Sequence, residues 1–143
     1  DGYMDIYNSS VRLDLLSFGA ADGSYTDVTL DRGIDHEWAT VSMRSQWSPS
    51  ILDLNADGLP DAVVAFGIYS SERTENRGFP DYVLMNLGHG RFEIGPLEPA
   101  REAFTQGITL ADMDLDGRPD LIESMDFSTI AGPSRLLYNR TEP

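Results

Sequence analysis

A short acidic pattern recurs along this chain, with an oxygen-bearing side chain at every second position. Residues 53–61 read DLNADGLPD, residues 112–120 read DMDLDGRPD, and the chain opens on DGYMD, which matches the last five positions of the pattern. Alternating oxygen ligands, with a glycine that permits a sharp turn, are how a short loop wraps a hard cation such as Ca²⁺. The spacing therefore predicts calcium loops at the two complete copies.

The acidic loops recur at a near-constant interval, which indicates a structural repeat. Their closing aspartates, Asp5, Asp61 and Asp120, are separated by 56 and 59 residues. Each loop precedes a short apolar run, and a second apolar run and a glycine turn follow. The first apolar runs are MDIY (4–7), AVVAFG (62–67) and LIES (121–124). The second runs with their glycine turns are LLSFGAADGSY (15–25) and YVLMNLGHGRF (82–92), and LLYN (136–139) starts a third copy. The pattern predicts short strands and tight hairpins, hence an all-β fold.

Composition narrows the classes of partner. The 143 residues include 24 acidic and 10 basic side chains, for a net charge of −14. This negative charge argues against nucleic acid or an anionic membrane surface as a binding partner. A hydrophobic fraction of 41% can form the core of one domain. No apolar stretch reaches membrane length, so we expect no membrane insertion.

The setting of the protein follows from the metal that the loops imply. Calcium loops of this kind fill where calcium is plentiful, which favours an extracellular, secreted or cell-surface location, or a periplasmic one. The chain has no cysteine, so disulfides give no information on the compartment. Because the chain opens inside a copy of the pattern, we expect a preceding segment that carries any export signal.

An EF-hand is the main alternative for the loops. Residues 112–123 satisfy its spacing, with Glu123 at position twelve. The middle loop has Val64 at that position, however, and both loops carry a proline, Pro60 or Pro119, at position eight. The flanking segments also have the pattern of strands rather than helices. These features disfavour an EF-hand.

The loop, the strand after it and the hairpin together resemble the VCBS/FG-GAP repeat, which forms the calcium-binding blades of integrin-α-like β-propellers. The N-x-G-x-G-x-F positions of the hairpin are Asn86, Gly88, Gly90 and Phe92. Residues 25–34, YTDVTLDRGI, are similar to the version in cartilage-acidic-protein-like and ASPIC/UnbV-associated proteins, where phenylalanine usually replaces Tyr25. The resemblance implies four-stranded antiparallel blades in an incomplete propeller.

The resemblance also implies the metal ligands. In the middle loop these are the side chains of Asp53, Asn55, Asp57 and Asp61 with the Leu59 carbonyl. In the last loop they are the side chains of Asp112, Asp114, Asp116 and Asp120 with the Arg118 carbonyl. The first loop keeps only Asp1 and Asp5, so we expect a partial site there that is weak or empty. From the number of carboxylates alone, the last loop should bind calcium more tightly than the middle loop.

Other features concern the organisation and surface of the chain. We expect a truncated first blade at 1–50, a complete repeat at 51–109 and a truncated third repeat at 110–143. Residues 31–50 are interpreted as a long connection with both tryptophans, and 70–81 as a polar insertion. Trp38 and Trp47 are candidates for contact with a ligand or partner, or for packing between blades. Asn8 and Asn139 begin N-glycosylation sequons and are candidate acceptors.

Three functions remain open at this point. The first is a calcium-binding module that presents loops to a protein or glycan in adhesion. The second is a structural subunit whose exposed edge strands pair with the rest of a propeller, or with other copies in a ring or filament. The third is a non-catalytic part of a polysaccharide-active enzyme. Because no acid and base converge outside the predicted ligands, we expect this chain not to be an enzyme.

Overall fold

The computed structural model describes residues 1–10, 14–34, 44–68, 80–101, 104–125 and 133–140. Over these residues the chain is almost entirely β, with one short 3₁₀ helix, η1 (Leu30–Arg32). The strands are β1 (Ile6–Asn8), β2 (Leu15–Gly19), β3 (Tyr25–Asp27), β4 (Arg44–Leu52), β5 (Asp61–Ile68), β6 (Tyr82–Asn86), β7 (Phe92–Pro96), β8 (Thr105–Ala111), β9 (Asp120–Met125) and β10 (Arg135–Leu137).

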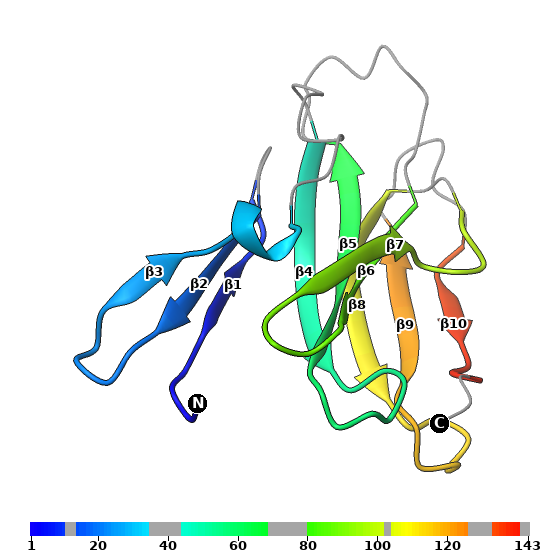
Figure 1. The fold of residues 1–143 in the computed structure, drawn as a ribbon. Helices are drawn as coiled ribbons and strands as arrows, with labels where there is room; N and C mark the ends of the chain where they lie inside the picture. The colour runs from blue at the N-terminus through cyan, green and yellow to red at the C-terminus, as the bar shows by residue number, and fades with distance from the viewer. Residues whose placement is uncertain (11–13, 35–43, 69–79, 102–103, 126–132, 141–143) are drawn as a thin grey trace.

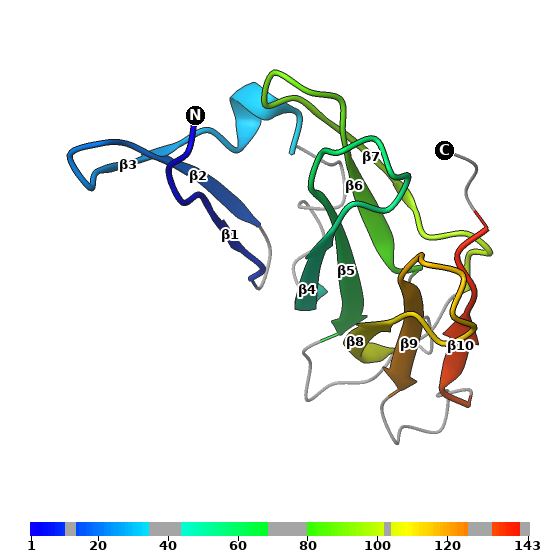
Figure 2. The ribbon, with the colours of Figure 1, turned by 90° about the horizontal axis from the view of Figure 1, so that it is seen from below.

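The strands form three antiparallel sheets that follow one another along the chain (Figure 1). The first sheet has the order β1-β2-β3, the middle sheet β4-β5-β6-β7, and the third β10-β9-β8. Viewed from below, the middle sheet lies between the other two (Figure 2). As described, the sheets do not close into a ring, which confirms the predicted all-β fold of propeller blades in an incomplete propeller.

The sequence pattern locates most strands but misses two. The apolar runs after the loops form β1, β5 and β9, and the glycine segments join β2 to β3 and β6 to β7. The interpretation of 31–50 as a connection is wrong for residues 44–50, which belong to β4. The strand leading into each acidic loop is polar and irregular, with register shifts at Trp47/Pro49 in β4 and at Thr105/Gly107 in β8. The predicted repeat boundaries at residues 50 and 109 are defined by the acidic loops. The strands do not test them, so they stay predictions.

The shift in β4 joins the middle sheet to the third. Ser48 has a left-handed backbone, with φ of 43°. Its hydroxyl oxygen accepts the N–H of Ile108 on β8 at 3.1 Å. The irregularity therefore places a polar group across the interface between two sheets.

β5 is the centre of the core because it is buried on both faces. One face packs in a cluster that joins the first and middle sheets, and the other in a cluster that joins the middle and third sheets. The first cluster contains Leu16, Ile34, Ala62, Val64, Phe66, Tyr82 and Leu84. The second contains Val63, Ala65, Val83, Leu97, Ile108 and Leu121. Burial on both faces explains why the AVVAFG run is continuously apolar rather than alternating.

Trp47 lies partly buried on β4 and packs against the second cluster. Its indole is so close to β5 that a Cβ added at Gly67 would lie 2.8 Å from the Trp47 Nε1. The side chain therefore contributes to packing, whereas its contact with a partner stays a prediction. Trp38 and residues 70–79 of the predicted insertion lie outside the described residues.

A buried carboxylate joins the first sheet to the middle sheet. Asp14, directly before β2, accepts hydrogen bonds from the hydroxyls of Tyr7 on β1 and Tyr82 on β6. The backbone N–H of Ser10 donates to the same carboxylate at 3.2 Å. Burial, together with the nearby Asp14 charge, raises the pKa of both tyrosines, so the phenols stay protonated donors.

A second buried acid lies between the middle and third sheets. Asp81 precedes β6 and accepts the N–H of Phe66 at 2.7 Å. It lies beside Glu123 of β9, which is fully buried and accepts a bond of 3.0 Å from Arg135 of β10. Burial, with the Glu123 charge adding to it, raises the pKa of Asp81 to about 7. Asp81 therefore gains a proton on folding at mildly acidic pH.

This pKa predicts a pH-dependent stability. The unfolded carboxyl titrates near 3.8 and the folded one near 7, so the folded state binds more protons between these values. The free energy of unfolding should fall as pH rises through this window, by on the order of a few kcal/mol. Asp81→Asn keeps an acceptor for Phe66 and should flatten the dependence. Urea unfolding in chelator at several pH values measures this.

The exposed acid Glu93 on β7 provides the control. Glu93→Gln removes one negative charge without touching the interface and should leave the slope unchanged. A slope that survives Asp81→Asn would assign the pH dependence to other groups.

Candidate metal centres

The two complete acidic loops are hairpin connections at the same end of neighbouring sheets, the lower end in Figure 1. One connects β4 to β5, where Leu52 pairs with Asp61. The other connects β8 to β9, where Ala111 pairs with Asp120. The final aspartate of each loop is thus the first residue of the strand after it.

The middle loop is folded by its own side chains. One oxygen of Asp53 accepts the N–H of Asp57 at 3.0 Å, and the other accepts the N–H of Gly58 at 2.9 Å. Asp57 accepts the N–H of Leu59 at 2.8 Å and the side-chain nitrogen of Asn55 at 2.9 Å. These bonds turn the backbone inward around its acidic side chains.

The last loop repeats the same hydrogen-bond frame. Asp112 accepts the N–H groups of Asp116 and Gly117 at 3.0 and 2.9 Å. Asp116 accepts the N–H of Arg118 at 2.9 Å. Two loops that share the pattern but differ at most intervening residues adopt one conformation, so the carboxylates determine it.

Each loop contains two residues with left-handed backbone. The expected glycines have φ of 84° at Gly58 and 88° at Gly117. Two positions earlier, Ala56 and Leu115 have φ of 60° and 63°. Sequence reasoning missed this second pair, because alanine and leucine rarely adopt this region. The hydrogen bonds to Asp53 and Asp112 hold it there.

The last loop fits a hard cation. One carboxylate oxygen from each of Asp112, Asp114 and Asp116 lies within 4.8 Å of the others. Oxygen ligands converging from alternate positions are the donor set that Ca²⁺ uses. The middle loop has the same frame with Asn55 in place of the second aspartate, so it offers two carboxylates and an amide oxygen. The carbonyls of Leu59 and Arg118 stay predicted ligands.

The closing aspartates are not part of this cluster and have another role. Asp61 and Asp120 are fully buried. Asp61 accepts backbone N–H groups from Leu54 at 2.9 Å and Asn86 at 2.8 Å. Asp120 accepts them from Met113 at 2.8 Å and Asn139 at 2.9 Å. We call this arrangement, a closing aspartate bonded to the loop start and to a later strand end, the aspartate staple.

The pKa of Asp120 reflects its donors. Burial opposes ionisation, but the backbone N–H groups of Asn139, Met113 and Asp114 and the charge of Arg140 outweigh it. The pKa therefore lies below its ordinary value, and the staple carries a full negative charge at neutral pH. A metal role for Asp61 and Asp120 stays a prediction.

Part of the staple is present in the first repeat. Asp5 accepts the N–H of Gly19 at 3.0 Å, and Gly19 occupies the repeat position of Asn86 and Asn139. Asp1 accepts the N–H of Tyr3 at 3.0 Å. Both aspartates are exposed, so the structure holds a partial loop without a converged carboxylate cluster among its described residues.

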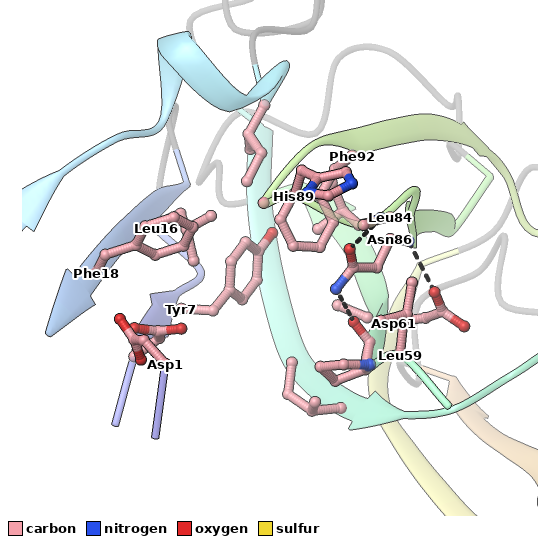
Figure 3. Close-up of a pocket in the computed structure, with 17 residues that line it drawn as sticks. Asp1, Tyr7, Leu16, Phe18, Leu59, Asp61, Leu84, Asn86, His89 and Phe92 are labelled. Carbon is pink, nitrogen blue, oxygen red and sulfur yellow. Dashed lines mark hydrogen bonds between the residues drawn. The ribbon is translucent and has the colours of Figure 1, made fainter. Parts of the chain in front are cut away.

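A pocket of about 390 Å³ lies between the first and middle sheets beside this partial loop (Figure 3). Its walls are mainly apolar, with polar groups at the acidic-loop end. Its lining includes Leu16, Phe18, Leu84, Phe92, Asp1, Asp5, Asn86 and His89. His89, whose side chain is exposed in the β6–β7 turn, is also part of the pocket lining.

The two candidate glycosylation positions differ in accessibility. Asn8 is exposed on β1. Asn139 is buried, and the side-chain nitrogen that would carry a sugar donates to the Leu54 carbonyl at 2.9 Å. Modification at either position stays a prediction, and in the folded chain Asn8 is the more accessible of the two.

Blade-like sheets whose hairpins carry carboxylate loops are the structure of a propeller-repeat protein, and comparison with known proteins identifies the repeat. Residues 53–122, which include both complete loops, match the family model of the FG-GAP-like repeat. The chain therefore contains an FG-GAP-like repeat region, as the sequence predicts.

Two curated relatives are integrin alpha-7 of Homo sapiens and of Rattus norvegicus. Each is 36% identical over 85 residues, which cover 57% of this chain and 7% of the relative. The chain thus spans a small part of the length of these relatives. Among the described residues, no helix has the length and apolar character needed to cross a bilayer.

The staple predicts that two aspartates of the last loop differ in how much they contribute to the free energy of unfolding. Asp120→Ala removes the acceptor of two backbone N–H groups and should lower the free energy of unfolding by about 2–4 kcal/mol in chelator. Asp114→Ala removes an exposed carboxylate and should change it by less than about 1 kcal/mol. Urea unfolding without calcium compares the two, and equal losses would argue against the staple.

Proposed function

We propose that this chain is a calcium-binding module of an extracellular or cell-surface protein. The main support is the convergence of three carboxylate oxygens in the last loop, within a hydrogen-bond frame that the middle loop repeats. The match to the FG-GAP-like repeat covers both loops. The net charge of −14 is also consistent with a protein that uses its acids to hold cations.

Calcium would act here as a structural ion. In the middle loop it would be held by Asp53, Asn55, Asp57, Asp61 and the Leu59 carbonyl, and in the last loop by Asp112, Asp114, Asp116, Asp120 and the Arg118 carbonyl. The ion supplies positive charge to carboxylates that otherwise repel one another. Because the ligands come together only in the folded chain, the binding free energy contributes to folding.

The binding function we propose is non-catalytic recognition of a protein or glycan in adhesion. The relatives that support this are named integrin alpha-7. Calcium would stiffen the loop end of the sheets, where a partner can contact adjacent loops together.

Thermal unfolding with calcium and with chelator tests the metal. We expect millimolar Ca²⁺ to raise the melting temperature, since calcium at 100 times its dissociation constant adds about 2.7 kcal/mol per site. Asp57→Ala and Asp116→Ala should each remove part of the shift, and Glu93→Gln should keep all of it. Circular dichroism provides the measurement, and an unchanged melting temperature in the wild-type protein would contradict calcium binding.

A second candidate function is assembly through the incomplete outer sheets. Their exposed apolar side chains favour it: Tyr3, Met4, Ile6 and Tyr25 in the first sheet region, and Leu136 and Tyr138 at the third. Each outer sheet has three described strands against four in the middle sheet. These surfaces would pair with the rest of a propeller or with other copies.

Sedimentation velocity tests assembly between copies. If copies pair, the chain of 15.8 kDa should sediment as larger species at high concentration. Met4→Glu places a charge on the exposed sheet region and should shift the population toward the monomer. Leu87→Glu, in the β6–β7 turn, is the control and should have no effect. A monomer at every concentration would leave the binding module as the supported function.

A further inference from the structure

Arg140 brings a guanidinium into the carboxylate cluster of the last loop. Its Nη1 lies 2.8 Å from Asp114 Oδ2 and 3.1 Å from Asp116 Oδ2. A second guanidinium, that of Arg118, places Nε 3.3 Å from the same Asp116 oxygen. Two of the three carboxylates that converge in this loop are therefore already paired with positive charge.

The middle loop has neutral residues at each corresponding position. Asn55 replaces Asp114, and Leu59 replaces Arg118. Leu87 replaces Arg140, because both follow the asparagine of the staple. Within the part of the chain that the structure describes, no ion pair reaches Asp53 or Asp57. The additional carboxylate of the last loop thus accompanies two additional cations.

The backbone next to Arg140 is anchored while its side chain is not enclosed. Asn139 donates its N–H to Asp120 at 2.9 Å and its side-chain N–H to the Leu54 carbonyl at 2.9 Å. The Arg140 guanidinium lies 5.1 Å from the centre of the Tyr138 ring, and the side chain is 61% exposed. The charge is therefore tethered beside the loop and can move into solvent without disturbing the staple.

We propose that Arg140 is an internal counter-ion of the last loop and competes there with a divalent cation. This inference rests on calcium binding by the loops, as proposed above. Calcium must displace the guanidinium to reach Asp114 and Asp116, and the nearby positive charge weakens its attraction. The middle loop has no such competitor among the described residues, so it fills first. This order reverses the one expected from the number of carboxylates alone.

A tethered cation also changes what the loop does without calcium. The guanidinium reduces repulsion among the carboxylates, so the last loop keeps its frame when calcium is removed. Calcium binding then replaces the guanidinium beside the carboxylates, instead of relieving repulsion among unpaired carboxylates. The last loop should consequently gain less stability from calcium than the middle loop.

Isothermal titration calorimetry of the full chain with CaCl₂ tests the proposal. Asp57→Ala isolates the last loop and Asp116→Ala isolates the middle loop. In the Asp57→Ala background, Arg140→Gln should tighten calcium binding by about three- to tenfold. Arg140→Lys keeps the charge and should bind like the parent. Arg91→Gln removes a positive charge elsewhere and should have no effect.

The reciprocal variant places the competitor at the other site. Leu87→Arg introduces a guanidinium at the corresponding position of the middle loop and, in the Asp116→Ala background, should weaken calcium binding there. This variant also tests the proposal if Arg140→Gln fails to fold in the absence of calcium. Binding that is unchanged in both Arg140→Gln and Leu87→Arg would overturn the counter-ion role. An absence of binding heat in every variant would instead overturn calcium binding itself.

Discussion

The buried closing aspartate is the interaction on which the repeats depend. Asp61 and Asp120 are both buried, and two backbone N–H groups donate hydrogen bonds to each of them. One donor comes from the start of the acidic loop and the other from the end of a later strand. Charge-assisted hydrogen bonds in a buried position are stronger than neutral ones, so each aspartate fixes loop and sheet together.

Local sequence patterns predicted the loops and the hairpins because their cause is local. Alternating carboxylates fold the loop through bonds of two to five residues, such as those of Asp53 to Asp57 and Gly58. The sequence pattern did not predict β4 and β8, because register shifts interrupt both strands. The shifted position in β4 makes a contact with another sheet, where the Ser48 hydroxyl accepts the N–H of Ile108. The buried acids Asp14 and Asp81 leave no periodic signal, since their partners come from distant segments.

The charge of the last loop shows the limit of reasoning from a motif alone. Its four aspartates lie within residues 112–120, but Arg140, which pairs with Asp116, is 24 residues away from that aspartate. The number of carboxylates therefore overstates the negative potential that a cation meets. The ligands of a site can be predicted from a short pattern, whereas the field around it depends on the tertiary structure.

The staple has a consequence for how these repeats tolerate variation. The same bond closes segments of 14, 25 and 19 residues in the three repeats. The entropic cost of closing a segment grows slowly with its length, so the bond holds both ends while the chain between them lengthens. The connection between the two strands that each bond spans is therefore a natural place for grafting foreign sequence, much as antibody frameworks carry hypervariable loops.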